Sequence, residues 1–197
     1  MKYFFLIAFY LIGSIPFSYL IALLFTGKDI RKMGSGNVGA TNVFRTTSPL
    51  PALLALLFDF LKGAFCVWLA SRYFGDTGSM AFAGLLAMIG HSFSVFLRFR
   101  GGKSVATGAG SFLLIAPLAI LCTLLVFALI LGIFRIISLG SVIAAIVFPL
   151  FVWIFGARDG VLLCGSLAAA LILFRHKSNI ARLMSGTEPR IGEAGSG

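Results

Sequence analysis

From Tyr3 to Phe25 the chain carries no charged side chain. As a helix this stretch is about 34 Å long, which is enough to cross the hydrocarbon core of a bilayer. It is longer than the apolar core of a signal peptide, so we expect a retained helix. In the whole chain 59% of the residues are hydrophobic and 11% are charged, whereas soluble domains carry roughly 25% charged residues. The sequence therefore predicts an integral membrane protein.

The remaining apolar segments decide how often the chain crosses the membrane. They are residues 50–70, 80–97, 105–134, 139–155 and 161–174. Basic residues gather in three connections, at 28–45, 98–103 and 175–190. Basic loops face the cytoplasm, and these three share a side only if residues 105–134 cross twice, with a break at 107–110 or at Ala116-Pro117. We therefore expect an all-α, polytopic membrane helix bundle with seven transmembrane segments, or six as the alternative, and with short or broken helices lining a cytoplasm-facing polar site. The N-terminus would lie outside and the C-terminus in the cytoplasm.

Charge and cysteine content narrow the classes of partner. The formal net charge is +10, and roughly half of this excess is the ordinary bias of cytoplasmic loops. Nucleic acid is not expected, because the basic residues lie in separate short loops and not along one continuous arm. The three cysteines lie in apolar segments and are interpreted as core residues without a disulfide. Two histidines and no clustered carboxylates predict no metal site.

Three polar, basic loops interrupt the apolar chain. They read GSGNVGATNVFR at 34–45, RFRGGKSVAT at 98–107 and RHKSNIARL at 175–183. Each loop combines a fixed positive charge with neutral hydrogen-bonding groups, and the first two contain glycines that let the backbone turn N–H groups toward a ligand. Such groups suit phosphate. At a membrane they indicate an enzyme that handles phosphorylated, lipid-linked substrates.

The sequence of the second loop must be distinguished from that of a nucleotide-binding motif. Gly101-Gly102-Lys103-Ser104 is similar to the end of a P-loop, but that motif requires glycine at position 97, where this chain has leucine. Nucleotide hydrolysis is therefore not expected. A cation remains next to a helix start at Ser104 or Val105, where backbone donors favour an anion. The alternative is a membrane-edge turn with a lysine that extends to the surface.

Other polar residues are interpreted by their spacing. His176 and Asn179 are three apart, which predicts one helical face that could hold a polyol or a phosphate; the alternative is a polar anchor at the interface. Asp59 and Lys62 have the same spacing inside an apolar segment and are expected to pair. His91 is expected to pack in support of the second loop.

With these residues in place, the chain resembles the bacterial acyl-phosphate:glycerol-3-phosphate acyltransferase family over nearly its whole length. The match includes GSIPFSY at 13–19, DIR at 29–31, the first two loops, and RHKSNIARLMSGTEPRIG at 175–192. Where the family usually has proline this chain has Val38 and Ser94, and where the family usually has glycine it has Ser104.

The resemblance implies transfer of a fatty acyl group from acyl phosphate to the sn-1 hydroxyl of glycerol 3-phosphate. The products would be lysophosphatidate and phosphate, in the first step of bacterial phospholipid synthesis. It implies one multi-pass domain in the cytoplasmic (inner) membrane, which we place at residues 1–191. From their composition, residues 192–197 are expected to form a flexible tail. The expected partners are the two substrates and membrane lipid, without a cofactor, a metal, nucleic acid or an obligatory protein partner.

The site follows from two substrates that each carry a phosphate of roughly −1.5 to −2 charge. The expected catalytic residues are Ser35, Arg45, Lys103, His176 and Asn179. The expected substrate-binding residues are Gly34, Gly36, Asn37, Thr41, Asn42, Gly101, Gly102, Ser104, Ser138 and Ser141. Structural support is expected from Asp59, Lys62, His91 and Glu188, the last by pairing with a basic residue. Among these, Ser35, Arg45 and Lys103 are assigned to the acyl phosphate, Gly101 and Gly102 to a phosphate hole, and Asn37, Asn42, His176 and Asn179 to glycerol 3-phosphate.

The proton acceptor is the least obvious part of the mechanism. The usual acyltransferase dyad has an aspartate five residues after a histidine, where this chain has Phe96 and Ala181. Acyl phosphate is already activated, so positioning and charge stabilisation suffice. We expect an acceptor phosphate oxygen to take the proton and His176 to serve as a hydrogen-bond donor. The alternative function is a small transporter of phosphate esters or anions, whose sites broken helices often form.

Overall fold

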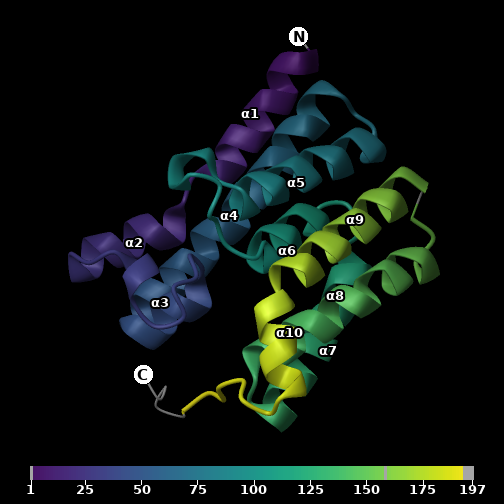
Figure 1. Ribbon diagram of the computed structural model, residues 1–197. Coiled ribbons are helices and arrows are strands. Elements are labelled where there is room, and N and C mark those ends of the chain that lie inside the picture. The colour runs from purple at the N-terminus through teal and green to yellow at the C-terminus, as the bar shows by residue number, and fades with distance from the viewer. Residues whose placement is uncertain (1, 158, 193–197) are drawn as a thin grey trace.

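The computed structural model describes residues 2–157 and 159–192, and every regular element in these ranges is a helix (Figure 1). In chain order they are α1 (Lys2–Ser14), α2 (Phe17–Thr26), the 3₁₀ turn η1 (Ile30–Lys32), α3 (Ala40–Thr46), α4 (Pro49–Tyr73), α5 (Thr77–Ser92), the 3₁₀ turn η2 (Val95–Leu97), α6 (Val105–Leu113), α7 (Pro117–Phe134), α8 (Ile137–Ile154), α9 (Asp159–Arg175) and α10 (Lys177–Met184). The all-α prediction is confirmed. The tail expected at residues 192–197 lies, from residue 193 onward, outside the described residues.

The first apolar stretch is broken, although its sequence predicts one retained helix. α1 ends at Ser14 and α2 begins at Phe17, with Pro16 at the N-cap. Proline has no backbone N–H, so the helix cannot continue its hydrogen-bond ladder through this position. At the break the Ile15 carbonyl accepts from the Phe17 N–H at 3.1 Å, and the buried Lys62 ammonium also donates to it at 2.8 Å.

The stretch at residues 105–134 divides before Pro117, as the sequence predicts. α6 has 9 residues and α7 has 18. The glycines at 108 and 110, considered as another possible break, lie inside α6. At about 1.5 Å per residue, α6 is too short to cross a bilayer of about 30 Å.

α6 lies in the middle of the bundle, packed against α4, α5, α7 and α9 (Figure 1). Glycines permit its close approach to α4. A Cβ at Gly63 of α4 would collide with the Thr107 carbonyl, and one at Gly110 of α6 would collide with the Phe60 carbonyl. Small residues that allow such contact are typical of helix packing in membranes, where lipid is as apolar as the side chains.

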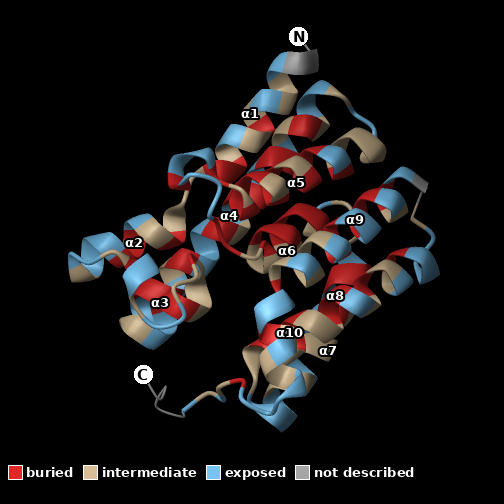
Figure 2. Cartoon of the chain, in the orientation of Figure 1, coloured by how far each residue is buried: buried red, intermediate tan, exposed pale blue. Residues whose placement is uncertain are grey.

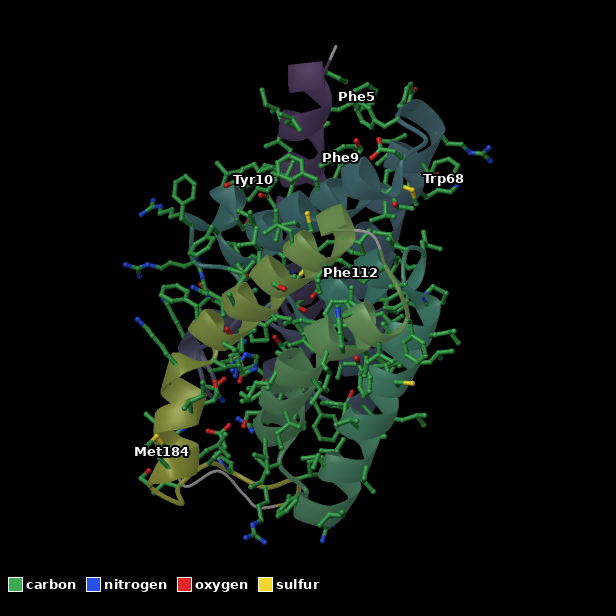
Figure 3. All side chains as sticks on the ribbon, turned by 90° about the vertical axis from the view of Figure 1, so that its right-hand side faces the viewer. Phe5, Phe9, Tyr10, Trp68, Phe112 and Met184 are labelled. Atoms are coloured by element: carbon green, nitrogen blue, oxygen red, sulfur yellow. The ribbon has the colours of Figure 1, made fainter. Side chains whose placement is uncertain are left out.

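Burial follows the same arrangement, with buried residues concentrated along α4, α5 and α6 (Figure 2). One core cluster joins α5 to α9 and includes Met88 and Phe112, and Figure 3 shows Phe112 in the middle of the bundle. α7 instead exposes a row of leucines at 118, 121, 125 and 129. This row is the face expected to meet lipid.

Five helical segments are long and apolar enough to cross a membrane, among the described residues, when α1 and α2 count as one span. α9 and α10 form a sixth candidate, bent by 62°. The chain therefore has a multi-pass membrane fold with five or six candidate spans. The expected seventh segment, which requires α6 to count as a span, stays a prediction.

Candidate active site

The first polar loop is held in shape by Asn42. Its side-chain oxygen accepts from the Ser35 N–H at 2.9 Å, and its amide nitrogen donates to the carbonyls of Ile30 and Met33 at 3.3 and 3.0 Å. Gly34 has a φ of +53°, and a Cβ there would collide with the Asn42 side chain. Both amide hydrogens of Asn42 are used by the loop, so the structure gives this residue a bracing task in place of the substrate contact that we expected.

The second loop is fixed from two sides. The N–H groups of Gly101 and Gly102 donate to the carbonyls of Ser92 and His91 at 3.1 and 3.0 Å. On the other side, the guanidinium of Arg175 donates to the carbonyls of Gly102 at 3.0 Å and Gly101 at 2.7 Å. The two glycine N–H groups are therefore not available to a phosphate, and our expectation of a phosphate hole built from them needs correction.

Close packing explains the two glycines instead. A Cβ at Gly101 would collide with the His91 carbonyl, and one at Gly102 would collide with the His91 ring. His91 thus supports the second loop, as its position in the sequence indicates.

The first turn of α6 supplies backbone donors near Lys103. The N–H groups of Val105 and Ala106 have no carbonyl one turn before them, and both residues line the main cavity described below. Ser104 precedes this helix with a φ of 61°, a left-handed conformation that glycine adopts at lower cost. Its buried hydroxyl lies 2.7 Å from that of Ser92 and donates to the Met88 carbonyl at 2.6 Å. The predicted helix start is confirmed, but the Ser104 side chain is used by the fold.

The third motif does not form one continuous helical face. His176 lies at the 62° bend between α9 and α10, and Asn179 lies in the first turn of α10. His176 Nδ1 is 2.8 Å from the Ile172 carbonyl. Because a carbonyl only accepts, Nδ1 carries the hydrogen, and the neutral ring has a lone pair at Nε2. This geometry makes Nε2 a hydrogen-bond acceptor, whereas we expected His176 to donate.

A chain of side chains connects the second and third motifs. Lys103 Nζ donates to Asn179 Oδ1, and Asn179 Nδ2 donates to Glu188 Oε1 at 2.6 Å. Ser138 donates to the same oxygen at 2.7 Å, and Arg182 Nε donates to Glu188 Oε2 at 2.7 Å. The predicted brace at Glu188 is present. We name this chain of five residues the mouth network.

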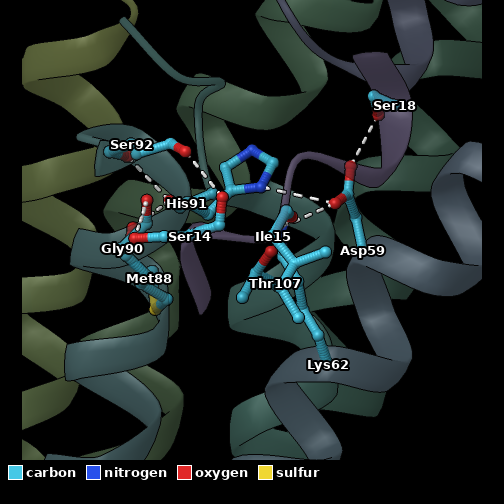
Figure 4. A network of polar contacts seen from close by, with 12 residues as sticks. Ser14, Ile15, Ser18, Asp59, Lys62, Met88, Gly90, His91, Ser92 and Thr107 are labelled. Carbon is cyan, nitrogen blue, oxygen red and sulfur yellow. Dashed lines mark hydrogen bonds and ion pairs between the residues drawn. The ribbon is translucent and has the colours of Figure 1, made fainter. Parts of the chain in front are cut away.

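A second network lies deeper, among membrane-spanning helices (Figure 4). Asp59 and Lys62 pair at 2.8 Å, which confirms the predicted ion pair. His91 Nδ1 lies 3.5 Å from Asp59 Oδ1, and Ser18 donates to Asp59 Oδ2 at 2.6 Å. Lys62 completes the group through the Ile15 carbonyl. We name these four side chains the deep network; it connects α2, α4, α5 and the break after α1.

The three motifs meet at one cavity of about 410 Å³. Its polar mouth is lined by residues of all three loops and of the C-terminal segment: Ser35, Asn37, Thr41, Arg45, Lys103, His176, Asn179 and Glu188. Ser138 and Ser141 of α8 also line it, as expected, with the Ser141 hydroxyl bonded to the Ile137 carbonyl at 3.0 Å. An apolar arm continues between α6, α7, α8 and α9, lined by Phe112, Ile120, Phe127, Phe148 and Ile172.

Burial changes the charge states at the mouth. It lowers the pKa of Lys103 to about 8, with the nearby arginines lowering it further and Glu188 opposing them. Burial, together with the charge of Lys103, lowers the pKa of His176 to about 4. The pKa of Glu188 is lowered despite its burial, because Ser138, Asn179 and Arg182 all donate to the carboxylate. Near neutral pH the mouth therefore presents a cationic lysine and a neutral imidazole.

A family model described as glycerol-3-phosphate acyltransferase matches residues 3–186. The chain belongs to this family. Glycerol-3-phosphate acyltransferases from Desulforamulus reducens and Syntrophomonas wolfei are 41% and 46% identical to it, each covering 92–93% of both chains. A crystal structure of PlsY (YgiH), an integral membrane glycerol 3-phosphate acyltransferase, in its glycerol 3-phosphate form has a TM-score of 0.91 and 42% identity, and covers 96% of this chain and 94% of that one. Its lysophosphatidic acid form has a TM-score of 0.89.

These similarities confirm the family that the sequence motifs predicted. They favour an acyltransferase over the alternative function, a small transporter of phosphate esters or anions. Sequence reasoning missed Arg175 as the residue that holds the second loop and Arg182 as the partner of Glu188. Both lie in the third motif, so their charges were visible. The groups that they bind, the glycine carbonyls of the second loop for Arg175 and the Glu188 carboxylate for Arg182, follow only from the fold.

Proposed function

We propose that this acyltransferase transfers a fatty acyl group from acyl phosphate to the sn-1 hydroxyl of glycerol 3-phosphate, at the cytoplasmic face of the bacterial inner membrane. The observation that carries the proposal is a cavity that combines an apolar arm with a cationic mouth. An acyl phosphate has the same two parts. The acyl chain occupies the arm, and the phosphate lies between Lys103 and Arg45 at the mouth.

The site performs the transfer by positioning and electrostatics. The glycerol hydroxyl oxygen attacks the acyl carbonyl carbon, and the bond from that carbon to the phosphate oxygen breaks as inorganic phosphate leaves. Lys103 and Arg45 stabilise the charge on the leaving phosphate, and the N–H groups at the start of α6 face the carbonyl oxygen as it becomes negative. These cations and dipoles are fixed before the reaction, so little reorganisation is needed.

A phosphate oxygen of the acceptor takes the hydroxyl proton. With a pKa of about 4, His176 is a weak base near neutral pH, whereas a phosphate monoester has a second pKa near 6. The Nε2 lone pair of His176 instead accepts a hydrogen bond from the acceptor and orients it. Asn179 and Asn37 complete the contacts to glycerol 3-phosphate.

Seven segments with the motifs in the cytoplasm fit this site best. The turn between α7 and α8 meets the third motif, since Ile191 donates to the Arg135 carbonyl at 2.7 Å and Ser138 donates to Glu188. The chain thus leaves the cavity mouth at Lys103 and returns beside it at Arg135. Because both positions lie on the same side, this return supports counting α6 and α7 as two segments. We expect single cysteines at Ser48, Phe99 and Ser178, in a background without native cysteines, to be labelled from the cytoplasm.

A cysteine at Tyr73, next to the α4–α5 connection, is the control, labelled only from outside. Labelling of Ser178 from the outside would indicate six crossings and would separate the third motif from the other two.

The donor is tested with purified protein in detergent and radiolabelled glycerol 3-phosphate. Labelled lysophosphatidate should form with acyl phosphate and not with acyl-CoA. Product from acyl-CoA alone would assign a different donor, and no product from either would contradict the proposed function.

A further inference from the structure

A second cavity of about 450 Å³ lies beside the first and is also lined by residues of all three loops. The two cavities share a wall of four residues: Ser35, Asn37, Lys103 and Asn179. The second cavity has no apolar arm. We name it the vestibule.

The vestibule has a one-sided charge. Its basic lining residues are Arg100, Lys103, Arg175, Lys177 and Arg182, and among the described residues no carboxylate lines it. The main cavity, by contrast, is lined by Asp59 and Glu188 as well as by cations. A lining of this kind attracts a small anion and repels a cation.

Two of these cations are not used by the fold. Arg175 holds the glycine carbonyls, Arg182 pairs with Glu188, and Lys103 donates to Asn179. The side chains of Arg100 and Lys177 are exposed and make no hydrogen bond or ion pair with another described residue. Lys177 lies over the Phe174 ring at 5.6 Å. Their charges are therefore available to a ligand.

The backbone before Arg100 is held in an unfavourable conformation. Arg98 and Phe99 have φ values of 53° and 61°, in the left-handed region that residues other than glycine rarely adopt. The Phe99 N–H donates to the Ser94 carbonyl at 2.8 Å, and the Arg100 N–H to the Leu97 carbonyl at 3.2 Å. This turn places Phe99 and Arg100 in the vestibule wall.

We propose that the vestibule is a binding site for a small, water-soluble phosphate dianion, separate from the acyl cavity. Glycerol 3-phosphate would be held there by Arg100 and Lys177 before it reaches the reacting centre, and inorganic phosphate would leave through it. The inference rests on the proposed function. It explains why Lys103 and Asn179 lie in a wall between an apolar and a basic cavity, because the lipid-soluble substrate and the water-soluble substrate then meet at this wall from opposite sides.

The test compares two double variants with the same loss of charge. Arg100→Gln/Lys177→Gln removes the two available cations of the vestibule. Arg98→Gln/Lys32→Gln removes two exposed cations that line neither cavity. The first variant should raise the KM for glycerol 3-phosphate about fivefold and weaken its dependence on ionic strength, with a smaller effect on the KM for acyl phosphate. The control should stay within about twofold of the parent protein, since its charges lie away from the vestibule.

Two further measurements distinguish the sources of phosphate. Inorganic phosphate should inhibit competitively against glycerol 3-phosphate, and this inhibition should weaken in the vestibule variant by a similar factor. Micelles that contain phosphatidylglycerol should not raise the KM of the parent protein for glycerol 3-phosphate. If they raise it, and the vestibule variant abolishes this rise, the site binds lipid headgroups and the proposal is overturned. Unchanged KM and phosphate inhibition in the vestibule variant would also overturn it. These outcomes presuppose lysophosphatidate formation by the parent protein, whose absence would refute the proposed function itself.

Discussion

The two polar networks of this acyltransferase are built from similar groups but differ in what surrounds them. In the deep network Asp59 and Lys62 are 2% and 4% exposed and pair with each other, and their further contacts include the Ser18 hydroxyl of α2 and the Ile15 carbonyl before it. In the mouth network Lys103 and Asn179 line both cavities, and Arg182 is half-exposed. An ion pair buried among membrane spans holds helices together, whereas a cation at a cavity wall remains able to bind a ligand.

The connection between the two networks runs through the second loop. His91 contacts Asp59 on one side and packs on Gly102 on the other, directly before Lys103. The deep network therefore positions the backbone that carries Lys103. Substitutions in the deep network should affect stability first, and substitutions at the mouth should affect kinetics first.

The largest expected effect is on stability, from Asp59→Asn. The change leaves the Lys62 charge buried without its carboxylate, and removal of one partner from a buried pair costs about 3–5 kcal/mol. The unfolding temperature in detergent should fall on the order of 10 °C. Asp29→Asn is the matched control, because it breaks an exposed pair with Arg31 and should change the unfolding temperature little. Equal effects of the two variants would show that the deep network does not hold the helices.

A kinetic effect at constant stability is expected from His176→Gln. The variant replaces a ring nitrogen that the fold orients through Ile172 with a more flexible amide, so the KM for glycerol 3-phosphate should rise about tenfold, the value of one hydrogen bond. Turnover should remain measurable, because His176 is not the base. Loss of turnover with acceptor binding intact by direct titration would make His176 the base and exclude the substrate-assisted route.

The smallest expected effect is a change in pH dependence. Phosphate binding needs the protonated form of Lys103, whose pKa is lowered to about 8 by burial. The kcat/KM for acyl phosphate should therefore fall as the pH rises through about 8. Lys103→Arg should remove this alkaline fall, since a guanidinium stays charged, and Glu188→Gln should move it to lower pH, since Glu188 raises the pKa of Lys103. The same alkaline fall in Lys103→Arg would assign it to another group.

Features that depend on local spacing were predictable from the sequence. The Asp59–Lys62 pair is a three-residue interval, the start of α7 is marked by Pro117, and the polar composition of the three loops indicated that they form one site. Features that depend on approach between distant segments were not predictable. The glycines at 101 and 102 fit a phosphate loop equally well in sequence, and only their contact with His91 assigns them to packing. The break at Pro16 was missed because the apolar composition continues through it.

The most direct test of the account is the catalytic efficiency of Lys103→Ala and Arg45→Ala, measured with unfolding temperature on the same samples. Each variant should lose a hundredfold or more in kcat/KM, which corresponds to about 3 kcal/mol of transition-state stabilisation. The unfolding temperature should change far less than in Asp59→Asn. Activity within threefold of the parent protein for both variants would contradict the assignment of these two cations to the phosphate.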